Sequence, residues 1–163
     1  MLLFTLTSAA LLAATPMAPV VATAAPVSFE MSVPVAANPH LQNARTALEQ
    51  GDVAMARREY QFAQVVDRDA GVIPVEATNG LAALLFAQSK PREAAEIMQQ
   101  LADEAARAGK IDLEASALVS ATWLRLECGD RIMAKQGVRR LREIARDKSI
   151  SAETRTLLKQ SIG

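Results

Sequence analysis

The chain has 163 residues, of which 50% are hydrophobic and only 4% aromatic, and its 18 Lys and Arg residues balance its 18 Asp and Glu residues. One Cys and seven residues each of Gly and Pro exclude a disulfide scaffold and a collagen-like or low-complexity chain. The single His and the single Cys cannot form a closed structural zinc site. Zero net charge argues against a general nucleic-acid-binding protein, so nucleic acid is not among the expected partners.

The charged residues are unevenly distributed along the chain. No charged residue precedes Glu30, whereas residues 30–115 contain 13 acidic and 8 basic residues and residues 116–163 contain 10 basic and 5 acidic residues. The first of these stretches therefore has a net charge of −5 and the second a net charge of +5. The zero total conceals an electrostatic dipole between the two parts of the sequence.

Residues 1–24 are interpreted as a signal peptide. Leu2 to Ala14 is an apolar run, and Ala22-Thr23-Ala24 has the small-x-small pattern of a cleavage site, so we expect cleavage after Ala24. The basic residue that usually precedes such a run is missing here. The alternatives are an uncleaved membrane anchor, for which the run is shorter than the ~20 residues of a span, and a disordered leader. Export to the periplasm or the exterior is expected, and residues 25–37 are expected to form an extended linker.

Residues 38–163 are predicted to form one all-α domain of seven helices, because no segment alternates apolar and polar residues as a half-buried strand does. The fifth helix, from about Ile111 to Cys128, is apolar nearly all round and should be the most buried. The sixth is expected to bury Ala134, Val138, Leu141 and Ala145. The residues that start or end the seven helices are Asn38-Pro39, Gly51-Asp52, Gly71, Pro74, Ser89-Lys90-Pro91, Gly109, Gly129-Asp130 and Ser151.

Three of these helix junctions repeat a pattern. The turns at Gly51, Ser89 and Gly129 are 38 and 40 residues apart, and each is followed five residues later by an alanine. A larger apolar residue follows the alanine by four positions, and another apolar residue comes three positions after that. A helical hairpin alone cannot bury both its faces, whereas stacked hairpins bury a continuous core. The three sets are Ala56, Tyr60 and Ala63; Ala94, Met98 and Leu101; and Ala134, Val138 and Leu141.

On these residues the chain resembles the tetratricopeptide-repeat (TPR) family. The first hairpin matches the family pattern at Gly51, Asp52, Ala56, Tyr60 and Ala63. The third hairpin matches at Gly129, Asp130 and Ala134, and the second at Ala94 and the apolar positions that follow it. The repeat is longer than the usual ~34 residues, and the family's large aromatic residue and proline are missing. The resemblance implies three stacked antiparallel hairpins, a TPR-like α-solenoid, with a C-terminal capping helix. The alternative is an ordinary helical bundle.

The resemblance also implies a binding groove, because in TPR proteins the first helix of each hairpin lines a concave surface that takes a peptide. Aligned on the three turns, the groove residues would be Arg45 and Leu48; Asn79, Ala83 and Phe86; and Val119, Trp123 and Leu126. Aromatic and Arg side chains are frequent energetic anchors of such interfaces. For Trp123 the alternative is packing in the core against the last helix.

A second candidate surface lies on the sixth helix. Five basic residues at spacings of 4, 4, 3 and 4 fall within an arc of about 80°, roughly 90° from the expected buried stripe. They are predicted to dock an acidic partner. The acidic half of another copy of the chain is one candidate, so that self-association is allowed. The alternative is an ordinary solvated helix face. The five residues are Arg131, Lys135, Arg139, Arg142 and Arg146.

The sequence gives little indication of catalysis. His40 is expected at the surface in the first helix, Cys128 is expected to be a small buried hydrophobe, and no glycine-rich nucleotide-binding loop is present. We therefore expect a non-catalytic protein–protein interaction module of the cell envelope, a scaffold or adaptor, with no cofactor, no metal and no stable membrane span. One alternative is a small helical enzyme or accessory subunit that uses carboxylates in a cleft. A nucleic-acid-binding fragment that uses the basic helix is disfavoured by net neutrality and export.

Overall fold

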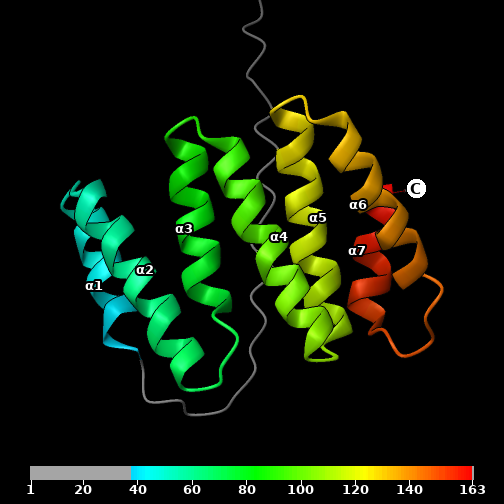
Figure 1. The fold of residues 1–163 in the computed structure, drawn as a ribbon, viewed down its shortest axis with the longest axis horizontal. Helices are drawn as coiled ribbons and strands as arrows, with labels where there is room; N and C mark the ends of the chain where they lie inside the picture. Colours follow the sequence, from blue (N-terminus) through cyan, green and yellow to red (C-terminus); the bar gives the residue numbers. More distant parts are fainter. Residues whose placement is uncertain (1–37, 163) are drawn as a thin grey trace, which may run out of the picture. The chain divides into compact units, whose positions relative to one another are not determined.

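The structure, a computed structural model, describes residues 38–162, so the predicted signal peptide, cleavage site and linker lie outside the described residues. This part of the chain forms seven α-helices and no strand, which confirms the all-α prediction for it (Figure 1). The helices are α1 (Pro39–Glu49), α2 (Val53–Asp69), α3 (Val75–Ala87), α4 (Pro91–Arg107), α5 (Ile111–Glu127), α6 (Arg131–Ile144) and α7 (Ala152–Ile162).

The first five junctions between these helices close in the same way. At the end of α1, the backbone nitrogen of Gly51 donates to the carbonyl of Leu48, and the next nitrogen, that of Asp52, donates to Ala47 at 2.8 Å. These two bonds satisfy the last carbonyls of the helix, and the left-handed backbone that they need suits glycine. Ser89 occupies the same place at the end of α3 although it is not glycine, with a φ of 59°. The predicted helix ends are therefore confirmed.

Side-chain caps fix the starts of four helices at the predicted residues, and at α7 the Ser151 hydroxyl accepts the backbone N–H of Thr154 at 3.1 Å. The Asp52 carboxylate accepts the backbone N–H of Met55 at 2.8 Å, and Asp130 accepts that of Met133 at 3.2 Å. Asn38 caps α1 and also donates its side-chain amide to the Ala63 carbonyl at 3.1 Å. Such caps each contribute about 1 kcal/mol, and the cap at Asn38 additionally attaches the start of α1 to α2.

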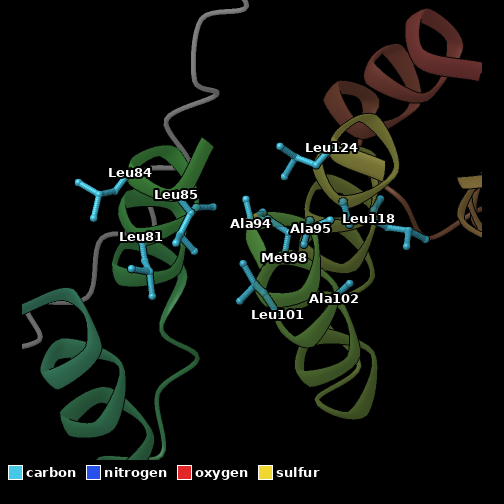
Figure 2. Packing of buried hydrophobic residues seen from close by; sticks show 14 of the residues in the cluster. Leu81, Leu84, Leu85, Ala94, Ala95, Met98, Leu101, Ala102, Leu118 and Leu124 are labelled. Atoms are coloured by element: carbon cyan, nitrogen blue, oxygen red, sulfur yellow. The ribbon is translucent and has the colours of Figure 1, made fainter. Parts of the chain in front are cut away.

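Each helix packs against the next one along the chain, and α7 turns back to contact both α5 and α6. In the centre, α4 lies between α3 and α5 and contacts both (Figure 1). The facing side chains are leucines on α3 and α5, whereas α4 contributes small residues together with Met98 and Leu101 (Figure 2). Small residues let helix axes approach closely, so the core is continuous from α3 to α5. No helix among residues 38–162 is long and apolar enough to cross a membrane.

The repeated positions are buried in register. The three alanines that follow the turns, Ala56, Ala94 and Ala134, are all buried. The apolar residues that follow them are buried as well, except Val138, which is only half-buried. The 38- to 40-residue repeat seen in the sequence is therefore also a repeat of packing.

The buried stripe of α6 differs from the predicted one. Ala145 is exposed, and the stripe consists of Ala134, Gly137, Leu141 and Ile144. The reason is that Gly137 lies directly against Thr122 of α5, where a Cβ atom would overlap the threonine hydroxyl. This close approach rotates α6 so that Ile144, not Ala145, points into the core.

Ion pairs join helices that are two apart in the chain. Arg57 of α2 pairs with Glu93 of α4 at 3.3 Å, and 11 residues further along both helices Arg68 pairs with Glu104 at 3.0 Å. Arg45 of α1 likewise pairs with Glu76 of α3. Exposed pairs of this kind each add less than about 1 kcal/mol. Their common pattern nevertheless favours one register of α1 and α2 against α3 and α4.

Candidate protein-binding surfaces

The position three residues before each repeated turn leaves an apolar side chain in solvent. Leu48, Phe86 and Leu126 occupy it on α1, α3 and α5, and they are 39%, 41% and 55% exposed. In each case the carbonyl of this residue accepts the hydrogen bond that closes the turn. The backbone geometry therefore fixes the same position in three helices, as the alignment on the turns predicted.

The side chains of Phe86 and Trp123 are in contact although they belong to different helices. Their ring centroids are 5.0 Å apart and their planes are inclined by 54°, an arrangement typical of favourable aromatic pairs. Phe86 belongs to α3 and Trp123 to α5, the helices on either side of α4. Trp123 remains 48% exposed, so the alternative that it packs in the core against the last helix is wrong. Leu126 follows Trp123 by three residues on the same helix face, and we call Phe86, Trp123 and Leu126 the aromatic patch.

The other predicted groove residues are placed less uniformly. Asn79 and Ala83 of α3 are exposed, whereas Val119 of α5 is half-buried against the core. Arg45 is exposed but its guanidinium is engaged by Glu76 of α3. Sequence reasoning did not anticipate Glu76, because residues 31 positions apart give no local signal of pairing.

The five basic residues on and after α6 are all exposed, and we call them the basic strip. Measured from the observed buried stripe, their mean direction is about 140° away around the helix, so they face solvent more directly than predicted. Within residues 38–162, none of the five has a carboxylate within salt-bridge distance. They are Arg131, Lys135, Arg139, Arg142 and Arg146.

Arg140 is the exception among the basic residues of α6. Its guanidinium donates to both oxygens of Glu114, at 2.7 and 3.2 Å, and also to Glu143. The hydrogen bonds that Arg140 donates to Glu114, and then the one it donates to Glu143, raise the pKa of Arg140 further above its usual range. Glu114 is buried on α5. Arg140 is therefore a structural residue and does not belong to the basic strip.

Two shallow hollows open on the described surface. The larger, of about 340 Å³, lies over the basic strip and includes Ile132, which is 76% exposed and was not predicted as a site residue. The same helical arithmetic that aligns the basic residues places Ile132 on the same face as Arg139, about two turns before it. The smaller, of about 210 Å³, lies between α1 and α2. The larger hollow is lined by Arg131, Ile132, Lys135, Gln136 and Arg139.

The carboxyl groups with shifted pKa values serve structural contacts. The hydrogen bond with His40, whose Nδ1 is 2.7 Å from the carboxylate, lowers the pKa of Glu59. Burial acts to raise the pKa of Asp112, but hydrogen bonds from Thr154 and Ser151 outweigh it and lower the pKa. Bonds from Ser149 lower the pKa of Asp147. A lowered pKa keeps each group ionised as an acceptor, which is the opposite of what a general acid needs.

Metal-ligating and thiol groups add no further site. Among residues 38–162 no group of three or more His, Cys, Asp and Glu side chains lies close enough to hold a metal ion. Cys128 is half-buried, with its sulfur 3.3 Å from the carbonyl of Arg125. The sequence predicted a small buried hydrophobe at this position, and the structure buries Cys128 only in part.

The chain matches no model of a known protein family, and comparison with curated proteins and with solved structures likewise finds no match. The likeness to tetratricopeptide repeats consequently depends on the recurring turns and the buried register alone. The two surfaces, the aromatic patch and the basic strip, are interpreted from their own geometry and charge.

Proposed function

We propose that this protein is a non-catalytic protein–protein interaction module, a scaffold or adaptor that binds a partner segment on its aromatic patch. Its architecture would be that of three TPR-like hairpins, α1–α2, α3–α4 and α5–α6, with α7 as the C-terminal cap. The observation that supports this most directly is the half-exposed pair of Phe86 and Trp123, 5.0 Å apart on two alternate helices.

The energetics of exposed aromatic side chains favour a binding role for this patch. A single exposed apolar residue is ordinary on any protein surface. Here two aromatic rings from different helices, with Leu126 three residues after Trp123, stay about half exposed although other large side chains are fully buried in the core. Tryptophan is the residue type most enriched at the energetic centres of interfaces. A partner that covers the patch would remove this apolar area from water.

The alternative of a carboxylate enzyme lacks a comparable observation. Such an enzyme needs a carboxyl group whose pKa is raised in a cleft so that it can donate a proton. Among residues 38–162 the three carboxyl groups with clearly shifted pKa values, Glu59, Asp112 and Asp147, are all shifted downward. Both hollows are shallow, and the larger one is lined by basic residues.

A comparison of two aromatic substitutions tests the proposal. Trp123→Ala removes the centre of the aromatic patch, whereas Phe62→Ala removes an equally exposed aromatic on α2, which is 49% exposed. Both variants and the original protein would be used to capture cross-linked partners from envelope extracts of the source cell. We expect a specific partner to be retained by the original protein and by Phe62→Ala, and lost with Trp123→Ala. Equal recovery with all three proteins would contradict the proposal.

The single tryptophan provides a second readout. Trp123 is 48% exposed, so its fluorescence should shift to shorter wavelength when the captured partner covers the ring. The shift should saturate with partner concentration and should disappear when Phe86→Ala weakens the site. Binding without any change in Trp123 emission would place the contact elsewhere on the protein.

Export to the cell envelope is part of the proposed function. It is supported by the uncharged apolar run from Leu2 to Ala14 and by the small-x-small pattern that ends at Ala24. N-terminal sequencing of the protein recovered from its native cell should give Ala25 as the first residue. An intact Met1 on protein from the cytosolic fraction would contradict export.

A further inference from the structure

The basic strip on α6 combines features that an ordinary solvated helix face does not need. Four of its five cations follow one face of α6, and the fifth, Arg146, lies in the turn just after the helix, so that the strip extends over about 22 Å. None of them has a carboxylate within salt-bridge distance in the described part of the chain. Carboxylates occur nearby in sequence, but Glu143 pairs with Arg140 and Asp147 bonds to Ser149. The strip therefore retains its full positive charge toward solvent.

The acidic residues of the same chain are mostly engaged elsewhere. The side chains of Glu76, Glu93, Glu104 and Glu114 pair with arginines, and Asp52 caps α2. The exposed acidic residues that remain on α2 and α4 are balanced by exposed basic residues on the same helices. Three further exposed acidic residues, Glu49, Glu127 and Glu153, lie on three different helices, α1, α5 and α7. The described part of a second copy of this chain thus offers no row of acidic residues on one helix to match the strip, and self-association is not the best explanation. On α2 and α4 the exposed acidic residues without an ion pair are Asp69, Glu96 and Asp103, and the exposed basic residues that balance them are Arg58, Arg92 and Arg107.

The hollow over the strip indicates the chemistry of its occupant. Arg131, Lys135 and Arg139 surround it, and Ile132 lies among them with 76% of its surface exposed. An occupant must supply anionic groups to the cations and an apolar group to the isoleucine. Four of the five cations of the strip are arginines, whose planar guanidinium binds carboxylates through two parallel hydrogen bonds.

We propose that the basic strip is a docking site for an acidic segment of another protein, with carboxylates along one face and an apolar side chain that covers Ile132. A helix with glutamates every four residues matches the spacing of the cations. A membrane surface of anionic lipids fits less well. Peripheral membrane helices place several large apolar residues beside their cations, whereas this strip offers one isoleucine and a narrow line of charge. The inference goes beyond the proposed function, because the strip shares no residue with the aromatic patch.

The test uses the full chain and a fluorescent peptide of about 16 residues, long enough to span the strip, with glutamates four residues apart and one leucine. Arg139→Glu with Arg142→Glu reverses two charges of the strip. Arg58→Glu with Arg92→Glu is the matched control, because it changes the net charge equally at two exposed arginines on other helices. Fluorescence anisotropy would be measured at low and high salt, alongside sedimentation with vesicles of phosphatidylglycerol and phosphatidylcholine.

We expect the original protein and the control to bind the peptide equally, the strip variant to bind about tenfold more weakly, and high salt to weaken binding. Ile132→Ser should weaken binding at high salt as well, where the apolar contact remains. Trp123→Ala should bind the peptide as the original protein does, because Trp123 belongs to the aromatic patch and not to the strip. A failure of this proposal can therefore be distinguished from a failure of the proposed function. An equal loss of peptide binding in the control variant would show that only the net charge of the protein matters, and it would overturn the proposal. Binding to the vesicles without binding to the peptide would also overturn it.

Discussion

The ring of Tyr60 on α2 lies directly against Gly80 on α3. A Cβ atom at Gly80 would overlap three atoms of the ring, Cε1, Cζ and the hydroxyl oxygen. One turn further along α2, the Gln64 amide donates to the Thr78 hydroxyl at 3.1 Å. Glycine in a helix interior costs about 1 kcal/mol relative to alanine. At this position it lets α2 and α3 approach each other closely.

Gly80→Ala should therefore destabilise the protein despite the higher helix propensity of alanine. We expect the free energy of unfolding to fall by about 1–3 kcal/mol, because the added methyl group overpacks the contact with Tyr60. Thermal unfolding followed by circular dichroism would measure the effect. Asn79→Ala, at the exposed neighbouring position, is the control and should change stability by less than about 0.5 kcal/mol. A Gly80→Ala protein more stable than the original would show that the ring moves away without cost.

The helix boundaries could be predicted because local chemistry determines them. Asn38, Asp52 and Asp130 accept backbone N–H groups close by in the chain, and the glycines after the helices adopt a backbone that few other residues favour. These contacts span five residues or fewer. The burial of the three repeated alanines was predictable for a related reason, since a repeated spacing indicates a repeated packing unit.

The contacts between elements could not be predicted in the same way. In α6 the apolar spacing favoured Val138 and Ala145, whereas the observed rotation depends on Gly137 fitting against Thr122 of another helix. The burial of Glu114 depends on Arg140, 26 residues away. For the aromatic patch the sequence supplied the register through the turns, but the 5.0 Å contact of its rings depends on how α3 and α5 pack on α4.

The pair of Glu114 and Arg140 should be strongly coupled. Glu114→Ala leaves the guanidinium without its main partner, and Arg140→Ala leaves a buried carboxylate, so Arg140→Ala should be the more harmful change. Because Arg140 itself is about half exposed, we expect a loss of about 1–3 kcal/mol for it, less than for a fully buried pair. The double variant should cost less than the sum of the single ones, by at least about 0.5 kcal/mol. Urea unfolding of all four proteins gives this coupling, and strict additivity would contradict it.

Removal of the aromatic patch should affect stability little. Trp123→Ala loses one contact with Phe86 and a half-exposed ring, so we expect a cost of about 1 kcal/mol. Leu118→Ala, in the buried core of the same helix, should cost about 2–5 kcal/mol. Chemical unfolding of both variants, followed by circular dichroism because one lacks the tryptophan, gives the comparison. A larger loss for Trp123→Ala than for Leu118→Ala would assign Trp123 to the core and weaken its proposed role in binding.

The attachment of α7 should depend on pH through Asp112. Its carboxylate on α5 accepts the backbone N–H of Ser151 at 2.9 Å, just before α7 begins. Because the pKa of Asp112 in the folded protein is lowered from its ordinary value of 3.8, the stabilisation is fully present above that pH and is lost as the pH falls through the lowered pKa. Asp112→Ala should therefore cost about 1 kcal/mol at pH 7 and much less near pH 2. The measurement is amide hydrogen exchange of α7 in both proteins at several pH values, with Glu96→Ala on α4 as the control. A difference between Asp112→Ala and the original protein that stays constant from pH 7 to pH 2 would show that the contact does not depend on the charge.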